Sequence, residues 1–127
     1  MLEKIVYKNN NITSITITWE ADFNELISVL KTFFDNNNTK HLLLDFRLCS
    51  FDTITHDNIR NLCEYATSRA NIESRVNRKT ALVGSNDLQL EICRIFETYS
   101  KMIGSATKIS VFSSILKAFS WLEEGRW

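Results

Sequence analysis

The sequence is poor in the residues that bend or break a chain. It contains no proline among its 127 residues and only three glycines, at Gly84, Gly104 and Gly125. So few glycines exclude a phosphate-binding loop built on several of them. The 15 basic and 15 acidic side chains give a formal net charge of zero. A neutral chain is a poor candidate for strong non-specific binding to nucleic acid, so we expect no nucleic-acid partner.

Long apolar runs are also absent from the sequence. The longest, Leu42-Leu43-Leu44, ends at Asp45. This is far short of the roughly 20 residues that a membrane-spanning helix needs. The chain also begins with no signal-like apolar run. We therefore expect a cytoplasmic protein without a membrane span.

Cysteine and histidine are too few and too scattered for a metal or redox motif. The spacing of Cys49, Cys63 and Cys93 matches no such motif, and the odd number favours buried, reduced thiols. His41 and His56 have no cysteine or acidic partner at ligand spacing. Both stand at the ends of predicted elements, which favours solvated imidazoles. The sequence therefore predicts no metal and no cofactor.

Apolar residues, by contrast, are plentiful. They make up 44% of the chain, and aromatic residues make up 11%. This content is too high for a disordered chain. At this length it is enough for a core that needs no disulfide or metal. We expect residues 1–127 to form one domain.

Periodicity predicts an α/β protein with the order ββαβαβαβα. Strands are expected over residues 4–8, 15–19, 41–46, 79–83 and 108–112. Helices are expected over 22–35, from a cap at Thr55, from a cap among Ser85, Asn86 and Asp87, and from Ser113 or Ser114. Residues 48–55 and 70–78 are predicted loops. Alternating strands and helices imply parallel pairing and right-handed crossovers, with only the first strand antiparallel in an edge hairpin.

The third predicted helix carries apolar residues along one face. They are Leu88, Ile92, Ile95, Phe96, Tyr99 and Met102. Turns are predicted at the two asparagine triplets, over residues 9–11 and 36–38, because asparagine tolerates left-handed backbone.

Three segments carry a family resemblance that spans nearly the whole chain. They are Leu43–Arg47 leading to Phe51, Lys79–Leu88 followed by Cys93–Glu97, and Val111-Phe112 followed by Ala118–Leu122. Together they resemble the SpoIIAA-like proteins, relatives of the STAS domains of anti-sigma-factor antagonists. The resemblance implies a superhelix of βα units with a mixed, mainly parallel five-stranded sheet and four packed helices.

The resemblance also implies a role in signalling. STAS domains are mainly non-enzymatic modules that bind a protein partner. In the antagonists, a serine that follows an aspartate at the start of a helix is phosphorylated to switch partner binding. Here Thr53 follows Asp52, although the small residues and glycine that normally come next are missing. Thr53 and Thr55 are the phosphoacceptor candidates, and helix N-capping is the alternative role.

A second function is implied by the related lipid-binding CRAL-TRIO fold. On this alternative the chain carries or senses a small apolar ligand or lipid. No acid, base and nucleophile set emerges from the residues, so we expect no enzyme.

Two polar groups are site candidates at predicted strand ends. Asp45 and Arg47 are two residues apart and so share a face of the predicted central strand. With Asp52, Arg60 and Arg94 they form either a polar site or a structural ion pair. Gly84, Ser85 and Asn86 make a strand-to-helix turn whose amides either bind an anion or are simply capped.

The last candidates are aromatic. Trp121 lies off the core stripe of the final helix, and Trp127 ends the sequence. Aromatic residues are common interface anchors, so both are candidates for contact with a partner chain, including a second copy of this chain.

Overall fold

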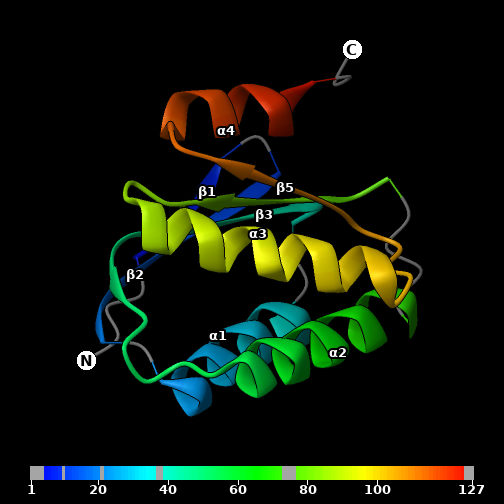
Figure 1. Cartoon of the computed structure of the whole chain (residues 1–127). Coiled ribbons are helices and arrows are strands. Elements are labelled where there is room, and N and C mark those ends of the chain that lie inside the picture. The colour runs from blue at the N-terminus through cyan, green and yellow to red at the C-terminus, as the bar shows by residue number, and fades with distance from the viewer. Residues whose placement is uncertain (1–4, 10, 21, 37–38, 73–76, 125–127) are drawn as a thin grey trace.

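The computed structural model describes residues 5–9, 11–20, 22–36, 39–72 and 77–124 (Figure 1). In chain order the elements are β1 (Ile5–Asn9), β2 (Ile12–Glu20), α1 (Phe23–Asn36), β3 (His41–Ser50), α2 (His56–Ile72), β4 (Lys79–Val83), α3 (Asp87–Met102), β5 (Lys108–Phe112) and α4 (Ile115–Glu123). The order of strands and helices is the one that periodicity predicts.

The strands form one sheet in the order β1-β2-β3-β4-β5. The pairs β2–β3, β3–β4 and β4–β5 are parallel, and β1 runs antiparallel to β2. Asn11, in the turn just before β2, has a φ of 64°, the left-handed backbone expected of the first asparagine triplet. Four parallel strands and four helices confirm the α/β class.

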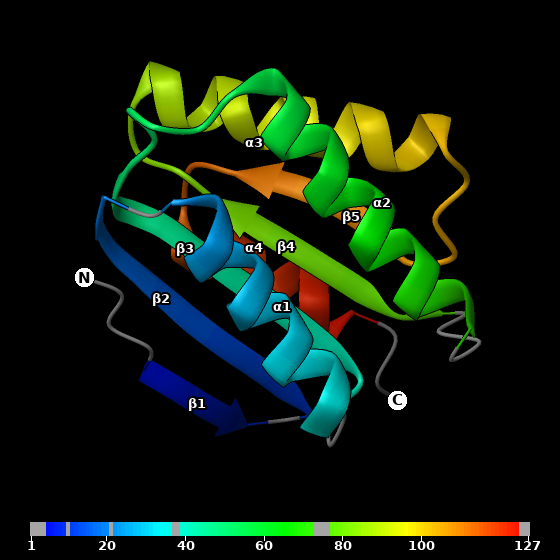
Figure 2. The same ribbon diagram turned by 90° about the horizontal axis from the view of Figure 1, so that it is seen from below.

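The helices cover the two faces of the sheet unequally. Helices α1, α2 and α3 lie on one face, and α4 lies alone on the other (Figures 1 and 2). Each right-handed crossover moves one strand further in the same direction, so its helix falls on the same face. The larger core fills the three-helix side around Ile17, Phe46 and Leu62. The smaller core lies under α4, around Leu43, Val83 and Leu122.

Polar caps begin the helices where the sequence predicts them. The Glu25 amide donates to the Asp22 carboxylate at 2.8 Å, and the Lys117 amide donates to the Ser114 hydroxyl at 3.3 Å. The Asn58 amide donates to the Thr55 hydroxyl at 3.1 Å. Asn86 caps α3. These contacts satisfy amides that have no partner within the helix.

Two predicted loop boundaries are wrong. Strand β3 continues to Ser50, into the loop predicted over 48–55. Its register against β2 shifts between Asp45 and Leu48, so two residues of β3 face one of β2. This β-bulge breaks the side-chain alternation while the strand goes on. Helix α2 likewise continues to Ile72, because the buried Ala70 anchors its last turn in the core.

The apolar face predicted for α3 is not buried along its whole length, and the prediction for His41 is wrong. Leu88 and Met102 are exposed at the two ends of α3, Met102 by 73%. His41, predicted to be solvated, is only 8% exposed. Its Nδ1 accepts a hydrogen bond from the Lys79 amide at 3.0 Å, which satisfies the imidazole between β3 and β4. The predictions for His56 and for the cysteines are confirmed, because His56 is exposed and all three cysteines are buried and free.

Candidate functional site

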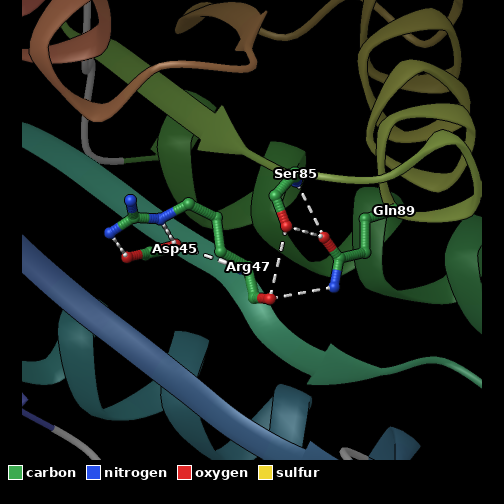
Figure 3. Close-up of polar contacts among 4 residues, drawn as sticks. All are labelled: Asp45, Arg47, Ser85 and Gln89. Atoms are coloured by element: carbon green, nitrogen blue, oxygen red, sulfur yellow. Dashed lines mark hydrogen bonds and ion pairs between the residues drawn. The ribbon is translucent and has the colours of Figure 1, made fainter.

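The middle of β3, level with the end of β4, holds a bidentate ion pair. Arg47 Nε donates to Asp45 Oδ1 and Arg47 Nη2 donates to Asp45 Oδ2, each at 2.9 Å (Figure 3). The Arg47 amide adds a third hydrogen bond to Oδ1, at 3.1 Å. The Asp45 side chain is 6% exposed and that of Arg47 is 40% exposed. The hydrogen bond that the Arg47 side chain donates to Asp45 raises the pKa of Arg47.

This geometry is what a structural ion pair requires, because both carboxylate oxygens are used within the strand. The other predicted members of a polar site lie apart from it. Arg60 pairs with Asp57 at 2.9 Å, on the first turn of α2. Asp52 and Arg94 are exposed, and no contact among the described residues joins either of them to the pair. A polar ligand site at Asp45 and Arg47 stays a prediction.

A buried amide, Gln89, ties β3 to the turn after β4. Its Nε2 donates to the carbonyl oxygens of Arg47 and Cys49, at 3.2 and 3.0 Å. Its Oε1 accepts from the amides of Ser85 and Asn86, at 2.8 and 3.3 Å. The sequence analysis missed this residue. Its signal is the capping box that an asparagine N-cap forms with glutamine three residues later.

The contacts of Gln89 also occupy the candidate anion site, the turn formed by Gly84, Ser85 and Asn86. The amides of Ser85 and Asn86 point at the Gln89 side chain, so an anion there would first have to displace it. A Cβ on Gly84 would lie 2.9 Å from the Gln89 Cβ. The glycine therefore lets α3 approach the end of β4 closely, which accounts for it without a ligand.

The phosphoacceptor candidates lie between β3 and α2. Thr53 and Asp52 are exposed in the short turn closed by the bond from the Ile54 amide to the Phe51 carbonyl, at 3.0 Å. Thr55 is also exposed, and it shares a reciprocal capping box with Asn58, whose Oδ1 accepts from the Thr55 amide at 3.1 Å. The structure thus assigns a capping role to the Thr55 hydroxyl and none to Thr53.

The aromatic candidate Trp121 is half-buried within its own chain. Its ring centroid lies 5.5 Å from that of Phe112, and the Lys79 amino group lies 5.1 Å from the Trp121 ring centroid. That amino group also donates to the Trp121 carbonyl at 2.7 Å. Trp121 therefore covers β4 and β5. Trp127 lies outside the described residues, and a homodimer through these tryptophans stays a prediction.

A cavity of about 70 Å³ lies inside the larger core, between the sheet and helices α1 and α2. Apolar side chains dominate its lining. In the part of the chain that the structure describes, no group of three or more His, Cys, Asp or Glu residues could hold a metal ion. No helix within the same residues is both long and apolar enough to cross a bilayer.

Comparison with known proteins shows the fold. No family model matches the chain, and no curated protein matches it significantly. The chain superposes on the crystal structure of an anti-sigma factor antagonist from Mycobacterium paratuberculosis with a TM-score of 0.66. The match covers 98% of this chain and 96% of that one at 8% sequence identity. The resemblance predicted from three segments is therefore confirmed at the level of the fold, which this chain shares with that antagonist.

Proposed function

We propose that this chain is a non-enzymatic regulatory domain that acts by binding a protein partner in the cytoplasm. The observation that carries the proposal is the fold match with an anti-sigma factor antagonist over nearly the full length of both chains. The buried, free cysteines are consistent with a reducing compartment.

The partner surface that we propose is the carboxyl edge of the sheet. The turn with Asp52, Thr53 and Thr55 is exposed there, and Leu48 on β3 is 68% exposed. Leu88, at the start of α3, is also exposed at this edge, where the parallel strands end. Exposed apolar side chains beside polar ones are typical of contact surfaces between proteins.

Within this surface we propose Thr53 as the phosphoacceptor. The Thr55 oxygen already accepts the Asn58 amide, and modifying it would disturb the cap of α2. Thr53 is exposed two residues earlier and follows Asp52 in the chain. A phosphate there adds nearly two negative charges at the edge where the partner would bind, so phosphorylation by a kinase would weaken that binding.

The test is quantitative co-purification of the full chain from its own cells. Wild type and Thr53→Ala should enrich the same protein, and Thr53→Glu should reduce its recovery at least tenfold. Thr98→Glu is the matched control, because Thr98 is an exposed threonine on α3. Equal loss with Thr98→Glu, or full recovery with Thr53→Glu, contradicts the switch. The absence of any protein enriched above a tag-only purification contradicts the partner function.

A second candidate function is the binding of a small apolar ligand. The observation that favours it is the cavity between the sheet and α1 and α2. A small ligand that co-purifies in stoichiometric amount, seen by native mass spectrometry, would support this function.

A further inference from the structure

The cavity runs along the inner face of the three-helix layer. Leu44 and Leu82 form its floor on β3 and β4, and Leu30 and Leu62 face them from α1 and α2. It extends to the amino-terminal edge of the sheet, where partly exposed residues such as Thr107 line it. The cavity is therefore an apolar space with a polar mouth.

Small side chains on α2 create this space. Beside Leu62, α2 lines the cavity at helical spacing with the smaller Cys63, Ala66, Thr67 and Ala70, whereas α1 lines it with Leu26, Leu30, Phe33 and Phe34. Protein interiors are close-packed, and a side chain that is too small for its site leaves a void that the surroundings close only in part. The small side chains of α2 therefore account for the void.

The charged side chains around the mouth are of one sign. Lys40, Arg78 and Lys79 line the cavity, and among the described residues its lining includes no aspartate or glutamate. The Lys79 amino group is bonded to α4 on the opposite face of the sheet. The Arg78 guanidinium donates to the Thr39 carbonyl at 3.2 Å, just before β3 begins, and its positive charge favours a ligand with an anionic head.

A buried hydroxyl lines the same cavity without a partner. Thr67 is 6% exposed, and its Oγ1 has no hydrogen-bond partner among the described residues. A threonine inside a helix commonly bonds the carbonyl one turn earlier, so an unbonded one is unusual. Threonine in a helix populates two χ1 rotamers, so its hydroxyl can turn toward a ligand that accepts a hydrogen bond.

We propose that the cavity binds a short-chain monocarboxylic acid. Its alkyl tail lies between α1, α2 and the sheet, and its carboxylate lies at the mouth, where Thr67 donates a hydrogen bond and Arg78 supplies the opposite charge. An engineered cavity of roughly 150 Å³ holds benzene. The present volume of about 70 Å³ therefore suits a tail of roughly three or four carbon atoms. This inference rests on the second candidate function and names its ligand.

The probe is butyrate, added at pH 7 to the full chain with labelled methyl groups and followed by NMR. We expect saturable shifts of the Leu30, Leu62 and Ile109 methyls, with a dissociation constant on the order of millimolar for so small a ligand. Acetate, which has too short a tail, should bind at least tenfold more weakly. Butanol has a tail of matching length and no charge, and it should bind at least fivefold more weakly.

Variants place the ligand in the cavity. Thr67→Val keeps the side-chain shape and Arg78→Gln removes the charge at the mouth, and each should weaken butyrate binding at least fivefold. Arg60→Gln, the same charge change at the other end of α2, should leave binding unchanged. Ala66→Leu fills the cavity and should abolish binding. If that variant fails to fold, Ala70→Val makes the same test with a smaller side chain.

The results distinguish an error in the proposed ligand, a monocarboxylic acid, from an error in the proposed function, the binding of a small apolar molecule. If butanol binds as tightly as butyrate and Ala66→Leu blocks both, the acid is wrong and the ligand-binding function stands. If neither butanol nor any of the acids gives saturable shifts, both are overturned. If butyrate still binds to the folded Ala66→Leu variant with unchanged affinity, the cavity is not the site.

Discussion

Two buried polar side chains, Gln89 near the carboxyl edge of the sheet and Thr67 on α2, differ in how fully they are bonded. At the carboxyl edge, both oxygens of Asp45 are bonded to Arg47, and the buried Gln89 amide uses both of its ends. On α2, the buried Thr67 hydroxyl has no partner among the described residues, and it borders a cavity. Gln89 is closed off by hydrogen bonds, and Thr67 is left open.

This difference follows from topology. Open α/β sheets usually bind ligands outside the carboxyl ends of their strands, where the strand order reverses and two loops diverge. Here the strands follow one another in sequence order, and α1, α2 and α3 share one face, so the described strands contain no such reversal. The polar groups at the carboxyl edge can therefore bond to one another. The space for a small molecule lies instead where the helices end.

The largest expected effect on stability comes from removing the hydrogen bonds of Gln89. Gln89→Ala removes the amide that bonds to β3 and to the turn after β4, and it leaves the buried carbonyl of Cys49 and two partly buried backbone groups without partners. Each unsatisfied buried group costs about 1–3 kcal/mol, so we expect the free energy of unfolding to fall by about 3 kcal/mol. Urea denaturation followed by circular dichroism measures this.

The amino edge offers a matched control for that variant. Asn71 also bridges two segments, donating to the Gly104 carbonyl at 3.3 Å and accepting from the Ala106 amide at 2.9 Å, but it is exposed. Water can replace these bonds, so Asn71→Ala should cost at most about 1 kcal/mol. Equal losses in the two variants would mean that the buried bonds of Gln89 contribute no more to stability than the exposed bonds of Asn71.

The regular parts of this fold could be predicted because their causes are local. The caps Asp22, Thr55 and Ser114 and the element order follow from hydrogen-bonding chemistry and periodicity. The bulge in β3 could not be predicted, since it depends on the register with β2. His41 looks solvated in sequence because its partner, the Lys79 amide, is 38 residues away.

The candidate site could be predicted only in part, because some of its contacts are local in sequence and others join distant segments. Asp45 and Arg47 are two residues apart in one strand, so their pairing could be read from spacing alone. The closure by Gln89 spans 40 residues to Cys49 and needs the fold. The cavity forms because α2 presents smaller side chains than α1 does. The sequence shows these sizes, but only the packing of both helices against the sheet shows that a space remains between them.

A smaller effect concerns the labelling rates of two buried thiols, Cys93 and Cys63. Burial raises the pKa of Cys93, on α3, to about 12 and that of Cys63, which lines the cavity, to about 11. The thiolate is the reactive form, so native Cys63 should react with iodoacetamide severalfold faster than Cys93 at pH 8. Peptide mass spectrometry after timed labelling measures the ratio. Equal rates would mean that global unfolding, rather than access through the cavity, controls labelling.

The same shifts set a direction for stability against pH. Both thiols have a higher pKa in the folded chain than their ordinary value of 9.0. Their contribution is therefore constant below about pH 9, and the free energy of unfolding falls as pH rises from there toward 11 and 12.

The smallest expected effect has the opposite sign and tests whether the Thr67 hydroxyl is left open. Without any ligand, Thr67→Val should raise the free energy of unfolding by roughly 0.5–1 kcal/mol, because it removes a buried hydroxyl with no partner and keeps the side-chain shape. Thr98→Val on the exposed face of α3 controls for the helix propensity of the exchange and should change stability by a few tenths of a kcal/mol at most. Urea denaturation with an unchanged slope compares them. A loss of about 1 kcal/mol in Thr67→Val would instead mean that the hydroxyl is bonded in solution, and Thr67 would then be closed off as Gln89 is.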